Sequence, residues 1–425
     1  MLTKELALKL FEAFSIERWN DLIRPCEMIE MDKAAERMVL AYIIGKYEEN
    51  AGNEIDWNWM IYASFFDLLK KIALCDIKSP VQRMIKNEYP AEYKKLEKWV
   101  LSQYKDILDK DLFTQFKEYI EHKDMACPTE PETKARERSS RVMRAAHKYS
   151  AMREFEMIKV VNEPFRIRNI EKQLNEDIES FLDLRGLQLL LTKQRPYEFL
   201  MIIEQLRFQT RWNQTPRVPK TSVLGHSYYV AAMTLMLSRQ DDVEFCKNRL
   251  YNNFFSALFH DLPEAVTRDI ISPVKQATHE LPSIVKNIED EIVRKELLPL
   301  MESFYSDEMM YFTSDEFENR IVLPQLEFDV PGKKECNSSK YAYSLEHVTF
   351  EDMNAKFNDE RYCPVDGKLV RCADHIAAFI EADSSIKYGI TSVHLRDGRD
   401  NICKIYAEKS SVNGFVPSAF FALFD

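Results

Sequence analysis

The sequence predicts an all-α protein built from two similar helical units in tandem, with a small insertion of mixed α and β structure in the second unit. Three observations support this prediction. The chain has 425 residues, which is too long for an ordinary single-core domain, and only 9 of them are Gly. Apolar residues recur at intervals of three and four, the period of a helix with one buried face. Finally, two segments of the chain match each other at a constant spacing.

The matching segments indicate an internal duplication. The tripeptide Arg18-Trp19-Asn20 recurs 193 positions later as Arg211-Trp212-Asn213. At the same spacing, Ser79-Pro80-Val81 recurs as Ser272-Pro273-Val274. A repeated tripeptide that contains the rare residue Trp, followed by a second match in the same register, is not expected by chance. We therefore predict repeat one at 1–160 and repeat two at 185–425.

The periodicity of repeat two predicts five helices, at residues 196–209, 222–238, 251–260, 281–304 and 368–387. The segment at about 310–366 is richer in Pro, Asn, Asp and aromatic residues, and parts of it alternate as short strands do. We expect this insertion to form a small hairpin over the site described below. In repeat one, the polar and Pro-containing residues 126–139 predict a loop.

Composition and charge exclude several classes of function. The net charge of −11 argues against binding to nucleic acid, although a metal ion could still attract a small anionic substrate. The first residues carry Glu5 and Lys9 in a helical pattern and do not form a signal peptide. No apolar run is long enough to predict a membrane span. The eight Cys include no Cys-x-x-Cys pair and are expected to be inert thiols in a reducing cytoplasm.

A set of His and Asp residues indicates a metal site. His260 and Asp261 are adjacent at the end of the apolar segment FFSALFHD, where a helical turn could direct both side chains to one metal ion. His226 and Asp374 lie on two other apolar helices, and a buried carboxylate needs a cation or a strong hydrogen-bond partner. A lone His on an apolar helix is, alternatively, a core residue with satisfied hydrogen bonds. Glu264 follows Asp261 by three residues and would project to the same side of a helix.

The order His, His-Asp, Asp on a helical scaffold resembles the HD superfamily of phosphohydrolases, and within it the HD-domain 5′-deoxynucleotidases. The resemblance covers most of repeat two, where the matching motifs are Arg211-Trp212, Gly225-His226-Ser227, His260-Asp261-Leu262-Pro263-Glu264, Asp269, Ser272-Pro273-Val274-Lys275 and Asp374. That family usually has Glu before the first His, where this chain has Gly225.

The resemblance implies one divalent metal ion with four protein ligands, namely His226, His260, Asp261 and Asp374. Mn²⁺, Co²⁺, Mg²⁺ and Fe²⁺ all suit such a set. Asp261 and Glu264 would carry the chemistry, with Glu264 as the general acid or base.

The resemblance also implies a set of substrate contacts. Arg211 would hold the phosphate, Trp212 would pack on the nucleotide and Asp269 would contact the sugar. Ser272 and Lys275 would add polar contacts. Since Arg18-Trp19 persists in repeat one, the Arg-Trp pair could instead be structural.

The function predicted from these features is hydrolysis of (deoxy)nucleoside 5′-monophosphates to nucleoside and phosphate. Another HD hydrolase, acting on nucleoside triphosphates, cyclic nucleotides or an alarmone, is an alternative. Alarmone hydrolases of the superfamily carry a Glu-Asp pair after the His-Asp pair, whereas Ala265 follows Glu264 here. A non-catalytic nucleotide-binding scaffold is a further alternative, but a structural metal site has no use for a nearby proton-transfer carboxylate.

Repeat one lacks the metal ligands. At the spacing of 193, Lys33, Asp67, Leu68 and Lys71 stand where repeat two has His226, His260, Asp261 and Glu264, and matching by eye sets Ala146 against Asp374. We therefore predict that repeat one is a degenerate HD fold without metal. The two repeats could pair as an intramolecular pseudo-dimer in place of the homodimer that many HD enzymes form, or they could be separate domains on a linker.

Overall fold

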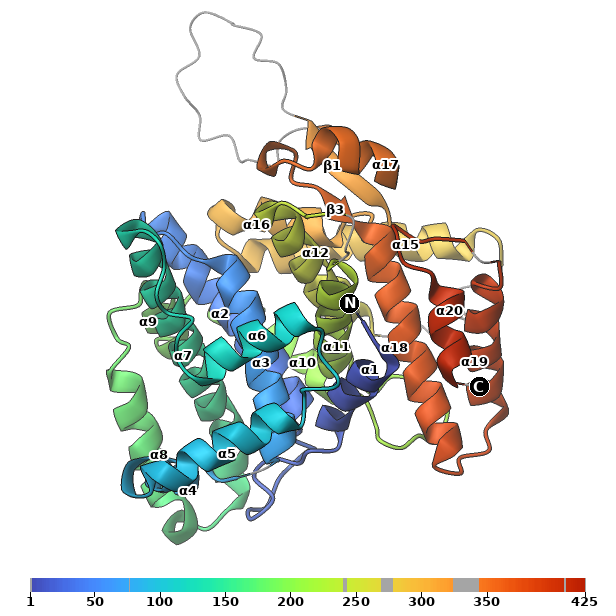
Figure 1. The fold of residues 1–425 in the computed structure, drawn as a ribbon. Coiled ribbons are helices and arrows are strands. Elements are labelled where there is room, and N and C mark those ends of the chain that lie inside the picture. The colour runs from blue at the N-terminus through green and yellow to red at the C-terminus, as the bar shows by residue number, and fades with distance from the viewer. Residues whose placement is uncertain are drawn as a thin grey trace, which may run out of the picture. The chain divides into compact units, whose positions relative to one another are not determined.

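The computed structural model describes residues 2–75, 77–239, 243–268, 278–323, 344–408 and 410–424. The chain divides into two compact units, Leu2–Gln188 and Leu189–Asp425, and helix α9 (Arg185–Leu191) carries the chain from one to the other. Helices dominate both units (Figure 1), which confirms the predicted all-α class.

In the first unit, α2 packs against α3 and α7, and these helices form its centre. Nearly every residue of α2 is buried, including several that carry charge. The helices of this unit are α1 (Lys4–Phe11), α2 (Glu30–Asn50), α3 (Trp57–Leu74), α4 (Ser79–Glu88), α5 (Pro90–Ser102), α6 (Lys110–Ile120), α7 (Glu130–Ile158) and α8 (Pro164–Glu179).

The loop predicted at 126–139 is wrong over most of its length, because α7 begins at Glu130. Thr129 and Glu132 form a reciprocal capping box, in which each side chain accepts a hydrogen bond from the other residue's backbone N–H. Pro131 lies in the first turn, where its missing N–H costs no helical hydrogen bond. The polar residues that suggested a loop are therefore a helix start.

In the second unit, α11 is buried along its whole length and packs against α10, α12 and α18. The principal helices of this unit are α10 (Tyr197–Phe208), α11 (Val223–Leu237), α12 (Lys247–Phe259), α13 (Glu264–Thr267), α15 (Leu281–Ile292), α16 (Ser303–Thr313), α17 (Phe350–Asp352), α18 (Gly367–Lys387), α19 (Val393–Ile405) and α20 (Pro417–Phe421). In the described part of the chain, no helix is both long enough and apolar enough to cross a membrane.

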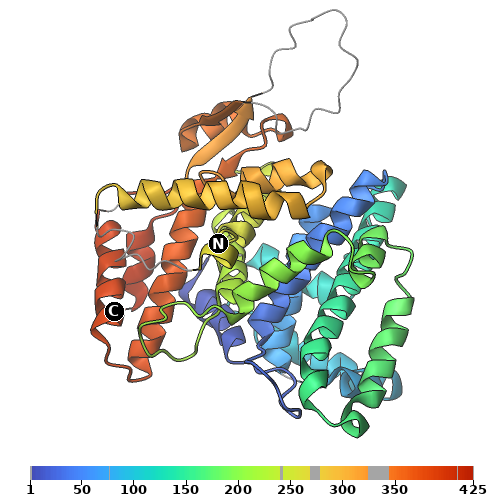
Figure 2. The ribbon, with the colours of Figure 1, turned by 180° about the vertical axis from the view of Figure 1, so that it is seen from behind.

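The helix predicted at 281–304 is divided in the structure. After α15 the chain makes a π-helical turn (Val293–Leu297) and a 3₁₀ turn (Leu298–Leu300), then adopts extended geometry at Met301 before α16 begins. Pro299 lies in the 3₁₀ turn, and its ring cannot continue a regular α-helix. Figure 2 shows α15 and α16 across one end of the second unit.

The insertion contains the predicted strands. A three-stranded antiparallel sheet has the order β2-β1-β3, formed by β1 (Asn319–Leu323), β2 (Ser344–His347) and β3 (Val365–Asp366). Within it Arg320 is paired with both His347 and Val365. The buried side chain of Arg249 on α12 makes two 2.7 Å bonds to Asp366, which anchors the end of β3, directly before α18, to α12. Residues 324–343, between β1 and β2, lie outside the described part.

Candidate active site

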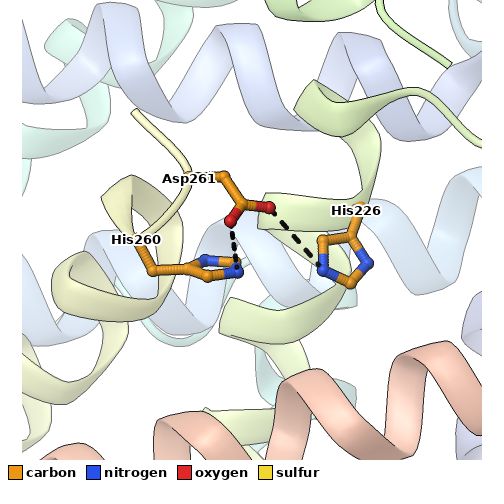
Figure 3. A group of neighbouring side chains, drawn as sticks. All are labelled: His226, His260 and Asp261. Atoms are coloured by element: carbon orange, nitrogen blue, oxygen red, sulfur yellow. Dashed lines mark ion pairs between the residues drawn. The ribbon is translucent and has the colours of Figure 1, made fainter. Parts of the chain in front are cut away.

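Three side chains of the second unit converge on one point (Figure 3). One ligand atom each of His226, His260 and Asp261 lies within 4.8 Å of the others. His226 comes from the first turn of α11, whereas His260 ends α12 and Asp261 follows it directly. The adjacent His-Asp pair can therefore face one ion because the chain turns at the end of a helix, as the sequence predicted.

The backbone fixes which nitrogen of His260 faces this point. Its Nδ1 lies 2.7 Å from the carbonyl oxygen of Ala257, and since a carbonyl can only accept, Nδ1 carries the proton. The remaining nitrogen, Nε2, lies 3.3 Å from Oδ1 of Asp261. His260 therefore presents an unprotonated Nε2 when its imidazole is neutral, which is the form that binds metals.

Asp374 joins the group from α18. Its Oδ1 lies 3.0 Å from Nε2 of His226, while Nε2 of His226 is also 3.9 Å from Oδ2 of Asp261. Burial opposes the ionisation of Asp374, but the hydrogen bond to His226 and the positive charges of His226, Arg211 and His260 outweigh it and hold the pKa of Asp374 well below its ordinary value. The structure thus groups three of the predicted ligands, His226, His260 and Asp261, and places Asp374 against His226.

Arg211 lies at the edge of this group. Its Nη1 is 3.6 Å from Oδ2 of Asp261 and its Nη2 is 3.8 Å from Oδ1 of Asp374, so its guanidinium faces both carboxylates. Its Nε is 3.4 Å from Glu381. A guanidinium held in this way keeps donors directed toward any anion bound beside the two aspartates.

Glu264 is placed near the same ligands by the chain itself. It is the first residue of α13, its backbone N–H bonds the carbonyl oxygen of Asp261 at 3.0 Å, and its side chain is buried. Its own carbonyl oxygen accepts a 2.9 Å bond from the side chain of Gln209, which fixes this turn against the loop before α11.

Glu381 is a residue that the sequence reasoning missed. It lies two turns beyond Asp374 on α18 and is completely buried. Its carboxylate bonds Trp212 and Thr221 and lies 3.4 Å from Nδ1 of His226. Burial opposes its ionisation, but the charges of Arg211, His226 and Arg217 and the bond to His226 hold its pKa far below its ordinary value. Because its partners Arg211 and Trp212 are 170 and 169 residues away along the chain, the sequence carried no local signal for this role.

Trp212 is held on both sides. Its indole N–H bonds Glu381 at 2.7 Å, and its ring lies so close to Gly398 of α19 that a Cβ there would be 2.5 Å from Cη2. Residues of the loop 210–220, Trp212 among them, line a polar recess of about 470 Å³. Trp212 therefore has a structural role and also borders a recess.

The insertion reaches the site through Phe317, whose ring centroid lies 6.1 Å from that of His260. The strands are anchored at Arg249 and Asp366, and the residues between β1 and β2, on which the predicted cover over the site depends, lie outside the described ones. Three predicted substrate contacts, Asp269, Ser272 and Lys275, also lie outside the described residues.

The donor set fits a divalent metal ion. Nε2 of His260 and Oδ2 of Asp261 are buried, and neither forms a hydrogen bond with any group in the described part of the chain. Buried polar atoms of this kind are costly unless a further partner satisfies them. Two imidazoles and two carboxylates are the ligands that Mn²⁺, Fe²⁺, Co²⁺ and related ions accept in hydrolytic sites.

Comparison with known families agrees with this geometry. Residues 203–403 match the family model of the HD domain. This match supports an HD-superfamily domain over these residues, and HD domains are in general metal-dependent phosphohydrolases. Comparisons with curated proteins and with solved structures found no match.

Proposed function

We propose that the chain is a divalent-metal-dependent phosphohydrolase that converts (deoxy)nucleoside 5′-monophosphates to nucleoside and phosphate. The observation that carries this proposal is the convergence of His226, His260, Asp261 and Asp374, with Arg211 directed at both carboxylates. The HD domain match supports the reaction class. The substrate class rests on the resemblance of the Arg211-Trp212 and His260–Glu264 motifs to the 5′-deoxynucleotidases.

In the proposed reaction the side chains bind the phosphate and move one proton. A divalent ion held by the four ligands would acidify a water molecule and withdraw charge from phosphorus. Arg211 would hold phosphate oxygens through its planar set of N–H donors. Glu264 would accept a proton from the attacking water and return it to the 5′-oxygen of the nucleoside as the P–O bond breaks.

The nucleoside would lie beside Trp212. The recess lined by Trp212, Asn213, Arg217 and other residues of the same loop combines an aromatic ring with polar groups that could bind a base or sugar. The two roles considered for Trp212 are compatible, because its N–H bonds Glu381 while the loop around it forms the recess.

A phosphate-release screen tests the proposal. Purified protein would be incubated with nucleoside mono-, di- and triphosphates in the presence of Mn²⁺, Co²⁺, Mg²⁺ or Fe²⁺, with Asp261→Ala as the inactive control. We expect release from monophosphates that depends on the metal. Release only from triphosphates or cyclic nucleotides would favour another HD hydrolase, and binding without release would favour a nucleotide-binding scaffold.

We also propose that residues 1–160 are a degenerate HD repeat and that 185–425 form the catalytic domain. Matching local features, 193 positions apart, support this. The isolated bridge Glu17↔Ile29 has its counterpart in Thr210↔Ser222. In both units the next residue begins a buried helix.

Unusual backbone angles recur at the same spacing. Trp19 and Trp212 have φ of 55° and 52°, and Cys75 and Arg268 have φ of 56° and 64°. Positive φ is uncommon for residues other than Gly, so two coincidences in one register support a shared fold.

Matching side-chain contacts support the same proposal. Arg18 and Trp19 both bond Glu154, as Arg211 and Trp212 both contact Glu381. This match sets His147 against Asp374, since each lies seven positions before its glutamate. We therefore propose His147, in place of Ala146, as the counterpart of Asp374.

Positive charge takes the place of the ligands in the first unit. Lys33 and Lys71 stand where the second unit has His226 and Glu264. The pKa of His147 is well below its ordinary value because of burial and because of the charges of Lys33, Lys71, Arg37 and Arg18. Basic side chains at the positions of two site residues of the second unit disfavour binding of a further cation, which supports the absence of a metal from this repeat.

The oligomeric state and location remain part of the proposal. Two HD-like repeats in one chain could form an intramolecular pseudo-dimer in place of a homodimer. Light scattering during size-exclusion chromatography would test this, with the mass of one chain expected. Cys75, Cys127, Cys246 and Cys372 are thiols in the structure, which suits the proposed cytoplasmic location.

A further inference from the structure

Glu381 accepts three hydrogen bonds and lies beside Nδ1 of His226, although it has no contact with solvent. Its Oε2 accepts a 2.7 Å hydrogen bond from Nε1 of Trp212 and lies 3.4 Å from Nε of Arg211. Its Oε1 accepts a 3.0 Å bond from the hydroxyl of Thr221 and lies 3.4 Å from Nδ1 of His226. The carboxylate thus joins one proposed metal ligand to both members of the Arg-Trp pair.

Which atom donates and which accepts in these hydrogen bonds follows from the donor and acceptor capacity of each group. Nη1 of Arg217 donates to Oγ1 of Thr221 at 2.6 Å, which leaves the hydroxyl hydrogen of Thr221 for Glu381. The indole and guanidinium groups can only donate. A carboxylate satisfies all of these neighbours because it only accepts, and it is complemented best when Nδ1 of His226 also carries a hydrogen.

We propose that Glu381 is a positioning residue of the metal site. With a metal ion bound in place of the hydrogen bond between Nε2 of His226 and Asp374, it would hold the imidazole of His226 with hydrogen on Nδ1, so that Nε2 faces Asp374 and Asp261 as a metal ligand, and it orients Arg211 and Trp212 at the edge of the same site. A carboxylate behind a ligating histidine commonly acts in this way. The inference rests on the proposed function, because it requires that the site bind a metal ion.

The equivalent glutamate of the first unit helps to distinguish the positioning of a metal ligand from the anchoring of an Arg-Trp pair. Glu154 bonds Arg18 and Trp19 as Glu381 contacts Arg211 and Trp212, but the position of His226 is occupied by Lys33, whose Nζ lies 3.7 Å from Glu154. Glu154 therefore anchors an Arg-Trp pair without orienting a ligand. The two glutamates form a natural pair of test and control.

Replacing Glu381 with Gln changes the hydrogen-bond pattern but little of the volume. If the amide oxygen of the new side chain faces Trp212 and Arg211, its NH₂ group faces His226 and Thr221. Thr221 can rotate to accept, but Nδ1 of His226 can accept only in the other tautomer, which places a hydrogen on Nε2. The substitution would therefore direct a hydrogen toward the metal position.

The experiment compares Glu381→Gln with Glu154→Gln in the full chain. Isothermal titration of metal-free protein with Mn²⁺ would measure affinity, and calorimetric melting without metal would measure stability. We expect both variants to melt at lower temperature than the unsubstituted protein. Only Glu381→Gln should weaken Mn²⁺ binding, by about 10–100-fold, the usual effect of losing such a carboxylate.

The outcomes distinguish the inference from the function on which it rests. If unsubstituted protein binds none of the divalent ions tested, the proposed metal site is wrong. If it binds Mn²⁺ and Glu381→Gln binds equally well, or no more weakly than Glu154→Gln, Glu381 is only structural. If Glu381→Gln does not fold, Glu381→Asp is the alternative, because it keeps the negative charge on a shorter side chain. Unchanged Mn²⁺ affinity in Glu381→Asp would overturn the proposal.

Discussion

The indole Nε1 of Trp212 donates a 2.7 Å hydrogen bond to Oε2 of Glu381, and Trp19 makes the corresponding 2.9 Å bond to Glu154 in the first unit. Both Trp residues have positive φ, which costs backbone energy in a residue with a side chain. A bond to a buried carboxylate offsets this cost. Only the Trp212–Glu381 pair lies beside the proposed metal ligands. The same substitution at Trp212 and at Trp19 should therefore have different effects on turnover.

Trp212→Phe and Trp19→Phe keep an aromatic ring and remove the N–H donor. Each should lower the free energy of unfolding by roughly 1–3 kcal/mol, the range for a hydrogen bond to a charged group. Trp212→Phe should also lower kcat/KM, whereas Trp19→Phe should leave turnover within about twofold. Calorimetry and phosphate-release kinetics would measure both effects. Equal losses of turnover in the two variants would contradict a special role for Trp212.

Asp261→Ala should lose the metal, because Asp261 supplies a buried carboxylate oxygen beside both imidazoles. Elemental analysis of purified protein should find about one divalent ion per chain before the substitution and much less afterwards. Asp67→Ala is the matched control, since Asp67 occupies the position of His260 in the first unit but is bonded to Arg37 and Tyr119. Equal metal content in Asp261→Ala and unsubstituted protein would show that these ligands do not hold the ion.

Glu264→Ala should keep the metal and lose turnover by about 10²–10⁴-fold, the usual contribution of a general acid or base. Metal content and single-turnover phosphate release would be measured on the same sample. Lys71→Ala, at the matching position of the first unit, should change turnover by no more than about twofold. Turnover near that of the unsubstituted protein in Glu264→Ala would assign the proton transfer to another group.

Polar residues that interrupt an apolar helical pattern, His260-Asp261 and Asp374, predicted a metal site, and the resemblance to the HD superfamily supplied the proposed ligand set. The sequence could not predict Glu381, because its role depends on Arg211 and Trp212, which are 170 and 169 residues away along the chain. A Glu near the end of a helix is ordinarily exposed, and only the fold shows that this one is buried.

Two segments gave wrong secondary-structure predictions because their sequence allows two interpretations. Residues 126–139 have the composition of a loop, yet Thr129 and Glu132 begin a helix of 29 residues by capping each other. Conversely, the helical pattern at 281–304 continues past Pro299, where the chain cannot remain α-helical. In both places a cap or a single Pro decides the boundary, whereas average composition does not.

Lys33 provides a prediction about pH, because it is a buried lysine at the position of His226. Its side chain is 1% exposed, and its Nζ forms no hydrogen bond within the described part of the chain. Burial lowers its pKa from 10.5 to about 7, although the charge of Glu154 opposes the shift. Removing the charge should therefore relieve a cost of folding that depends on pH.

The direction of this pH dependence follows from the protonation of Lys33 in the folded and in the unfolded protein. Below about pH 7 lysine is charged in both folded and unfolded protein, and the full cost of burying it is present. Between pH 7 and 10.5 the unfolded chain binds the extra proton, so the free energy of unfolding rises with pH, by up to about 1.4 kcal/mol per unit. Lys33→Met should raise Tm most near pH 6, and its advantage should shrink toward pH 9. Calorimetry across this range would measure the difference in Tm between Lys33→Met and the unsubstituted protein, with the exposed Lys95→Met as control. A difference that does not change with pH would mean that Lys33 is not buried as a charge.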